Sequence, residues 1–255
     1  MSPELTRDGE GNSRPSTGAK GTVVEFFGVP GAGKSTIAHH VGQRLAADGY
    51  SVAEPTYTLV HDRTRIRRYL AKMRYAVSTT ARRPDRTLSS GRLLAATAQP
   101  THSTTGKLLF NWLFVQGVVD AHRGDGVRLL DQGLCQAVWS VALRADHDRL
   151  MELSERAVNA LSRTGSAHIV IVEITPETAR NRLAARATDE SRVSPTEADG
   201  TIVDAFECKA RVEKAIVAAA ADEPTIDIVR VRNETSADLE RSTGELYEAL
   251  TTTSA

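Results

Sequence analysis

The chain has 255 residues, with 32 lysines and arginines against 32 aspartates and glutamates, so its formal net charge is zero at pH 7. This balance argues against a chain that is basic or acidic throughout, and any site for a polyanion would have to be local. The length suits one α/β domain, which we expect over residues 21–255.

Before that domain we expect a disordered tail over residues 1–20. The start of the chain lacks the apolar segment of a signal peptide, and no run approaches the roughly 18 apolar residues of a membrane helix. Cys135 and Cys208 form neither a C-x-x-C pair nor a metal-ligand spacing. We therefore expect a cytoplasmic protein without a membrane partner, a disulfide framework or a zinc site.

Strands and helices alternate along the rest of the chain, which is the pattern of a parallel sheet covered on both faces. The predicted strands are 22–27, 50–54, 127–131, 168–174 and 226–231. The run 168–174, HIVIVEI, is almost continuously apolar, as buried parallel strands are. We predict an α/β three-layer sandwich with a five-stranded, mostly parallel sheet and helices on both faces.

Helices are predicted in the intervals between these strands. The first follows a glycine-rich loop and stops at Gly49, and another begins at Pro176, a residue suited to a first helical position. A long helical section over 60–123 is interrupted near ARRPDR and again near AQPTHSTTG. The polar stretch 187–200 is predicted to be a mobile loop.

The glycine-rich loop GVPGAGKST, residues 28–36, follows the first predicted strand directly. Its spacing, with Gly28, four residues, then Gly33, Lys34 and Ser35, is that of the phosphate-binding loop of nucleoside triphosphatases and P-loop kinases. Gly28 and Gly33 are expected to adopt backbone angles closed to other residues and to turn N–H groups toward phosphate oxygens. The residues predicted to bind ATP are Gly28, Pro30, Gly31, Ala32, Gly33, Lys34, Ser35 and Thr36.

Two side chains of the loop have predicted roles in the chemistry. Lys34 is expected to reach the β and γ phosphates, and the Ser35 hydroxyl to ligate Mg²⁺. A second acidic group for the metal is expected at the end of a neighbouring strand, and Asp131 closes the apolar strand VRLLD. We therefore predict Mg²⁺ at Ser35 and Asp131, the alternative for Asp131 being a turn residue.

In order and spacing, the chain resembles a thymidylate-kinase-type P-loop kinase from about residue 21 to 250. The resemblance is carried by the glycine loop and by segments that parallel the family's motifs: AEPTYT at 53–58, RIRRYL at 65–70, KLLFNWLFVQGVVDAHRGDG at 107–126, VRLLDQG at 127–133, ITPETARNRLAAR at 174–186 and the final strand and helix at 226–250. It implies a phosphotransferase with a helical acceptor-binding region over about 56–124 and a lid over about 187–200.

The resemblance also implies a lid of arginines over the phosphates, formed by Arg182, Arg186 and Arg192. Cations around the transferring phosphoryl group stabilise its oxygens, and a lid excludes water. The alternative is that Arg182 and Arg186 form a solvated helix face.

The acceptor is where the chain departs from the family. Asp131, Gln132 and Gly133 stand where the family has aspartate, arginine and tyrosine, which leaves both a nucleoside monophosphate and a hydroxyl compound open as acceptor. The resemblance implies that Glu54, Arg67 and Gln132 line the acceptor site. For Glu54 the position at the end of a predicted strand agrees, since the carboxyl ends of strands meet at the crevice of such sheets. For a hydroxyl acceptor, Glu54 or Asp131 is the candidate base.

The predicted function is thus an ATP-dependent kinase, with two alternatives. One is an ATP-hydrolysing switch, in which Gln132 positions water. The other is a nucleic-acid-binding or end-phosphorylating module that uses residues 61–92, where ten arginines and lysines stand against two aspartates. Apolar side chains over 105–120 are expected to face the core, with a homodimer interface as the alternative.

Overall fold

The computed structural model describes residues 21–61, 64–121, 126–143, 147–185 and 200–252. Its centre is one five-stranded sheet in the order β2-β3-β1-β4-β5, in which every paired strand is parallel. The strands are β1 (Thr22–Phe27), β2 (Val52–Ala53), β3 (Val127–Leu130), β4 (Ser166–Glu173) and β5 (Ile226–Arg232). The predicted α/β sandwich with a five-stranded sheet is confirmed.

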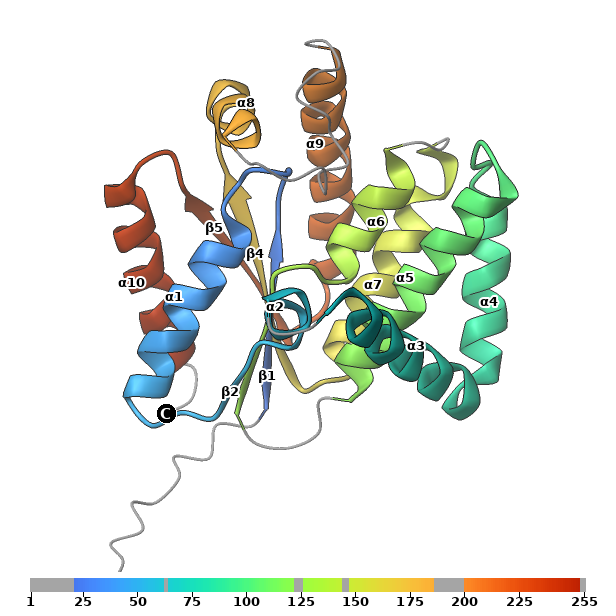
Figure 1. Ribbon diagram of the computed structural model, residues 1–255, viewed down its shortest axis with the longest axis horizontal. Coiled ribbons are helices and arrows are strands. Elements are labelled where there is room, and N and C mark those ends of the chain that lie inside the picture. The colour runs from blue at the N-terminus through green and yellow to red at the C-terminus, as the bar shows by residue number, and fades with distance from the viewer. Residues whose placement is uncertain (1–20, 62–63, 122–125, 144–146, 186–199, 253–255) are drawn as a thin grey trace, which may run out of the picture.

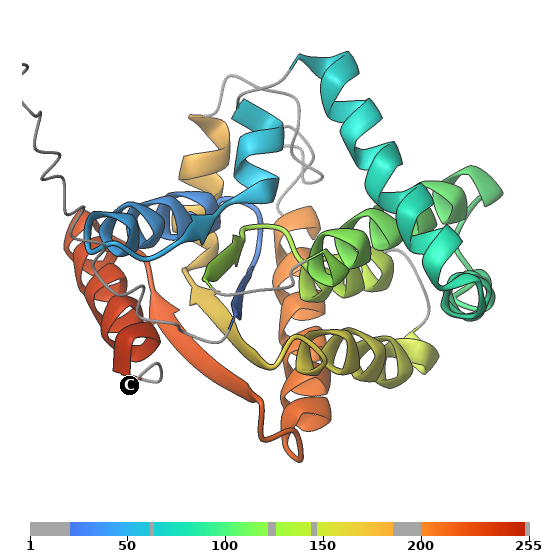
Figure 2. The same cartoon turned by 90° about the horizontal axis from the view of Figure 1, so that it is seen from below.

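Helices cover both faces of this sheet, as Figures 1 and 2 show. One face is covered by α1 (Lys34–Ala47) and α10 (Ser236–Thr252), and the other by α5 (His102–Asp120), α6 (Leu134–Ala142), α7 (Leu150–Ser162) and α9 (Gly200–Ala220). Outside α5 lie α3 (Arg65–Arg82) and α4 (Pro84–Ala95). The remaining elements are α2 (Pro55–His61), the short 3₁₀ helix η1 (His147–Arg149) and α8 (Pro176–Ala184).

The central strand β1 is buried along its whole length, which explains its apolar, β-branched sequence. Its side chains alternate between two clusters: Val23 and Phe27 join the core under α5, α6 and α7, while Val24 and Phe26 join the core under α1 and α10. Glu25 shares the face of Val23 and Phe27, so a carboxylate lies inside the first core.

Strand β2 is shorter than the predicted 50–54. The Tyr50 N–H donates to the Leu45 carbonyl at 3.0 Å, so Tyr50 still belongs to the end of α1. At the other end, the Glu54 carbonyl accepts the Thr58 N–H at 2.9 Å and opens α2, which begins at Pro55. Helix ends on both sides therefore leave only two residues for the sheet.

The predicted breaks in the long helical section are confirmed. Helix α3 ends before Pro84, which starts α4, and α5 begins after Thr101, whose hydroxyl accepts the Thr104 N–H at 3.1 Å. Most apolar residues of α5, including Trp112 and Phe114, are buried in the core, as expected, while Leu109 and Phe110 are half-buried. Among the described helices, none is both long and apolar enough to cross a membrane. The predicted tail and most of the predicted lid lie outside the described residues.

Candidate active site

The glycine loop, residues 28–36, joins the end of β1 to the start of α1 at the carboxyl edge of the sheet. Gly31 and Gly33 have φ values of +86° and +83°, in the left-handed region that favours glycine. Gly28 was predicted to need such an angle and does not show one. Glycine is required there because a Cβ would lie 2.8 Å from the Val172 carbonyl oxygen of β4.

The lysine of the loop turns back over it. Lys34 Nζ donates to the carbonyls of Gly28 at 2.8 Å and Val29 at 3.0 Å. The ammonium thus lies over the loop backbone, at the first turn of α1, where the helix dipole also favours an anion. A phosphate bound at the loop would meet both positive charges.

Ser35 and Asp131 are 96 positions apart in the sequence but in contact in the fold: Ser35 Oγ donates to Asp131 Oδ2 at 2.5 Å. Asp131 follows β3, the strand beside β1, and its side chain is buried. Its second oxygen, Oδ1, is buried with no hydrogen-bond partner among the described residues.

This pair fits a Mg²⁺ site. A hydroxyl and a carboxylate are hard oxygen ligands, and the unpartnered Oδ1 supplies a further lone pair for a cation. Within the described part of the chain no group of three or more His, Cys, Asp and Glu side chains is gathered to hold a metal. A magnesium ion at this pair would therefore depend on phosphate oxygens and water for its remaining ligands.

Arg182 and Asn233 hold the loop from its other side. Arg182, on α8, donates to the carbonyls of Gly31 at 3.4 Å and Glu234 at 3.2 Å. Asn233, directly after β5, is buried and its Nδ2 donates to the Ala32 carbonyl at 2.7 Å. A Cβ on residue 33 would lie 2.2 Å from that nitrogen, so the position of Asn233 leaves room only for a glycine at Gly33.

Sequence reasoning missed Asn233. The only feature of the sequence that pointed to it is its position: it is a polar residue directly after the last strand, which ends at the same edge of the sheet as Asp131. The predicted partners Arg186 and Arg192 lie outside the described residues.

Two cavities meet at the glycine loop, and both include Gly31 and Gly33 in their walls. The first, which we call the helix-side cavity, has about 460 Å³ and is lined by Pro30, Lys34, Ser35, Arg68, Lys72, Asn111, Asp131, Gln132, Gln136 and Ser140, among others. The second, the strand-end cavity, has about 520 Å³ and is lined by Thr36, Arg182, Asn233, Glu234 and Thr235, among others. A loop between two cavities can hold a phosphate chain with one group on each side.

The residues predicted for an acceptor site do not all lie at the helix-side cavity. Gln132 lines it, whereas Glu54 and Arg67 are not among its wall residues. Besides Lys34 of the loop, its cations are Arg68 and Lys72, which lie on the adjoining face of α3. The one-residue difference between Arg67 and Arg68 turns the side chain by about 100° around the helix, from solvent toward the cavity.

The Glu54 carboxylate makes its contacts behind the glycine loop, with residues of α1. Its carboxylate oxygens lie 3.2 and 3.3 Å from His39 Nδ1, and the His39 ring stacks on Tyr57 with ring centres 4.5 Å apart. It also packs on Gly42, where a Cβ would be 2.6 Å from Glu54 Oε1. The carboxylate therefore secures α1 against the start of α2, away from the cavity, because β2 ends beside the middle of α1.

A buried carboxylate that the sequence did not single out supports the wall of the helix-side cavity. Glu25 Oε1 accepts the Cys135 N–H at the start of α6, and Glu25 Oε2 is buried without a partner among the described residues. Burial raises the pKa of Glu25 from 4.5 to about 7, although N–H groups of α6 pull it back. Gly133 is required here, since its Cβ would overlap the Glu25 carboxyl group.

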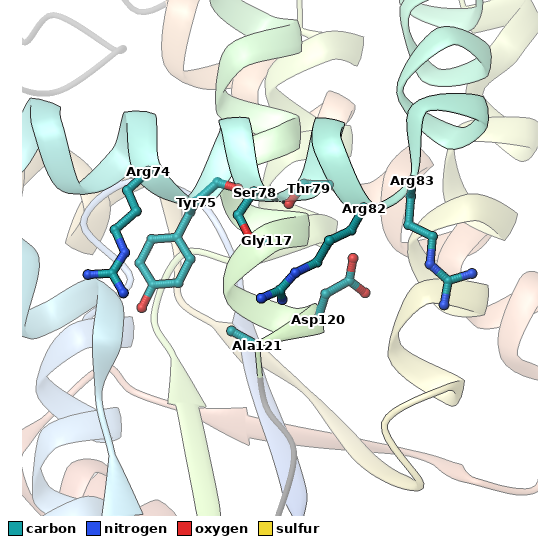
Figure 3. Close-up of a pocket in the computed structure, with 9 residues that line it drawn as sticks. All are labelled: Arg74, Tyr75, Ser78, Thr79, Arg82, Arg83, Gly117, Asp120 and Ala121. Atoms are coloured by element: carbon teal, nitrogen blue, oxygen red, sulfur yellow. Dashed lines mark hydrogen bonds between the residues drawn. The ribbon is translucent and has the colours of Figure 1, made fainter.

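A further cavity lies away from the loop, between α3 and α5 (Figure 3). It is smaller, about 160 Å³, and is lined by Arg74, Arg82 and Arg83 with Asp120 among them. The basic stretch predicted over 61–92 thus has its arginines spread over different surfaces, with Arg68 at the helix-side cavity and Arg82 at this one.

No protein-family model matches this chain, and no curated protein matches its sequence.

Proposed function

We propose that the chain is an ATP-dependent phosphotransferase of the nucleotide-kinase type, which transfers the γ-phosphoryl group of ATP to a small acceptor. The observation that carries the proposal is the contact of Ser35 with Asp131 beside a glycine loop that separates two cavities. A binding module for a single ligand has no need of two cavities that share a phosphate-binding loop.

In this proposal the donor nucleotide lies along the loop. Its phosphates would be held by the loop N–H groups and by Lys34, and its nucleoside would occupy the strand-end cavity beside Arg182 and Asn233. The planar guanidinium of Arg182 suits stacking on a base or a fork-like contact with phosphate oxygens. Ser35 and Asp131 would hold Mg²⁺, which neutralises charge on the phosphates when bound.

The acceptor would occupy the helix-side cavity. Arg68 and Lys72 add two positive charges to that of Lys34 in this cavity, and Asn111, Gln132 and Ser140 give it polar groups. This combination favours an acceptor carrying a negative charge. In the transfer, an acceptor oxygen forms a bond to the γ-phosphorus while the bond from that phosphorus to the β–γ bridging oxygen breaks, and ADP leaves. A monophosphate acceptor is already ionised at neutral pH, so no general base is required.

A hydroxyl acceptor would have to lose a proton, and Asp131 is the carboxylate that lines this cavity. Of the two candidate bases, Glu54 is the less suited, because its carboxylate contacts His39 and does not line the cavity. The two cations that α3 contributes to the cavity make the monophosphate the preferred acceptor class.

The test is ATP turnover by the purified protein with Mg²⁺, alone and with a panel of nucleoside monophosphates, nucleosides, sugars and short oligonucleotides. We expect one acceptor to raise turnover strongly over a low background. Lys34→Ala should lower that turnover at least about 100-fold, as loss of a group that stabilises developing charge typically does. Lys214→Ala, which removes an exposed lysine of α9, is the matched control and should leave turnover unchanged.

A second candidate function rests on Gln132, which lines the same cavity as Ser35 and Asp131 and is exposed there. In an ATP-hydrolysing switch, this amide would position the attacking water. Turnover that is rapid without any acceptor, indifferent to the panel and lost in Gln132→Ala would favour hydrolysis over transfer.

A further inference from the structure

A cavity at the outer end of the helical region is lined by arginines and lies apart from the glycine loop. It has about 320 Å³, within the usual range for small-ligand sites, and lies between α4, α5 and α7. Its charged wall residues are Arg86, Arg156 and Arg163, and none of its wall residues is acidic. We refer to it as the arginine cavity.

The three arginines differ in how they are held. Arg156 Nη1 donates to Ser89 Oγ at 2.8 Å and Nη2 to Glu152 Oε1 at 3.4 Å, which fixes one guanidinium in the wall. Arg86 and Arg163 make no side-chain hydrogen bond or ion pair that the described residues show. One anchored and two unanchored guanidinium groups therefore border the same cavity.

The charge of Arg163 is disfavoured by its surroundings. Burial lowers the pKa of Arg163, and repulsion from the positive charges of Arg86 and Arg83 lowers it further. The negative charges of Asp120 and Glu223 offset part of this repulsion, but neither lines the cavity. Arg86 also lies in the first turn of α4, where the helix dipole adds positive potential.

The rest of the lining supplies neutral polar groups around a buried floor. Ser89, Ser90, Gln116 and Asn159 carry hydroxyl and amide groups, and Trp112, which also lines the cavity, is buried. Guanidinium groups with neutral donors are the groups that recognise a phosphate, because they offer several N–H and O–H donors. Among the described residues, the one carboxylate that contacts them, Glu152 on Arg156, is not part of the cavity wall. The volume leaves room for a small group attached to that phosphate.

We propose that the arginine cavity binds a phosphate anion, either inorganic phosphate or the phosphate of a small phosphomonoester, between Arg86, Arg156 and Arg163. The site is independent of the glycine loop and of the proposed phosphotransfer. Helix α5 separates them, since Asn111 and Val115 line the helix-side cavity while Trp112 and Gln116 line the arginine cavity.

The two tryptophans of the chain allow each site to be observed separately. Trp139 lines the helix-side cavity and Trp112 the arginine cavity. In a Trp139→Phe protein, Trp112 is the sole tryptophan, and Lys34→Ala added to it removes the ammonium of the glycine loop. Titration of this protein with inorganic phosphate, followed by fluorescence and by calorimetry, should show one saturable event per chain.

Arg86→Ala and Arg163→Ala, introduced one at a time into that protein, should each weaken phosphate binding at least about tenfold, because each removes a charge-assisted contact. Arg211→Ala is the control. This arginine of α9 is exposed, its Nη2 lies 3.2 Å from Glu207 Oε2, and it is far in sequence from the residues that line the cavity. Circular dichroism of each variant checks that the fold is kept. A sugar phosphate that binds more tightly than inorganic phosphate would identify the phosphomonoester as the ligand class, and tighter binding of inorganic phosphate would identify free phosphate.

Three results would overturn the proposal. One is the absence of saturable binding at millimolar phosphate in the protein that retains all three arginines. Another is binding that is weakened equally by Arg211→Ala. The third is a response confined to oligonucleotides, which would assign the arginines to a polyanion surface.

Discussion

The pKa of Glu25 leads to a quantitative prediction about stability. This carboxyl group is fully buried on the central strand, and its pKa is raised from 4.5 to about 7 chiefly by loss of water. In the unfolded chain it ionises near its usual value. Between pH 4.5 and about 7 the native state therefore binds more protons than the unfolded state, and stability falls as the pH rises through this window.

The size of the effect follows from the two pKa values. Each pKa unit corresponds to about 1.4 kcal/mol, so full ionisation of Glu25 costs the native state about 3 kcal/mol. Glu25→Gln removes this cost while keeping the shape and an oxygen that can accept the Cys135 N–H. We expect the free energy of unfolding of the variant, relative to wild type, to rise by about 2 to 3 kcal/mol between pH 5 and pH 8.

Urea unfolding of both proteins at pH 5, 6, 7 and 8 measures this difference. Buried His168, whose pKa is lowered by burial, acts in the opposite direction, but it is present in both proteins and cancels. Glu240→Gln, which replaces an exposed carboxylate of α10, should give a curve parallel to wild type. A Glu25→Gln curve that also runs parallel to wild type would refute the reasoning.

Further predictions concern the loop and its neighbours. Gly33→Ala should lower the free energy of unfolding by about 1 kcal/mol or more, because of the positive φ and because the new Cβ would contact Asn233. Gly49→Ala is the control, since Gly49 has a positive φ but no neighbour within 4 Å. Equal shifts in melting temperature would mean that the contact with Asn233 contributes nothing. Asn233→Ala should weaken nucleotide binding in calorimetry, because the Ala32 carbonyl loses its partner; unchanged affinity would remove Asn233 from the site. Arg68→Ala should raise the KM for an anionic acceptor about tenfold or more and leave the KM for ATP unchanged, and an equal rise in both would contradict the assignment of the two cavities.

Local patterns were sufficient to predict the main elements of the fold. The apolar runs at 22–27 and 168–174 predicted buried strands, and both strands are in the sheet. Pro176 marked a helix start, because a proline lacks the N–H that a first helical residue does not need, and the ARRPDR stretch marked a break, where α4 starts at Pro84. These features depend on residues close together in the sequence, so the sequence expresses them directly.

The candidate site was predicted in part. Ser35 and Asp131 were expected together because parallel strands end at one edge of the sheet, and the structure brings them into contact. Glu54 was expected at the same edge by the same argument, but β2 ends early and its carboxylate contacts His39. Strand order predicts which residues approach the edge, while the direction of each side chain depends on the neighbouring helix.

The sequence by itself determined the alternating elements, the glycine loop and the residue types suited to phosphate chemistry, because each is encoded within one short segment. Only the tertiary structure decided that Arg68 rather than Arg67 faces the cavity, that Asn233 supports the loop, and that Glu25 is buried beneath α6. These outcomes depend on packing between segments far apart in the chain. On a helix, neighbouring residues in the sequence point in different directions, so one can face solvent while the next faces a site.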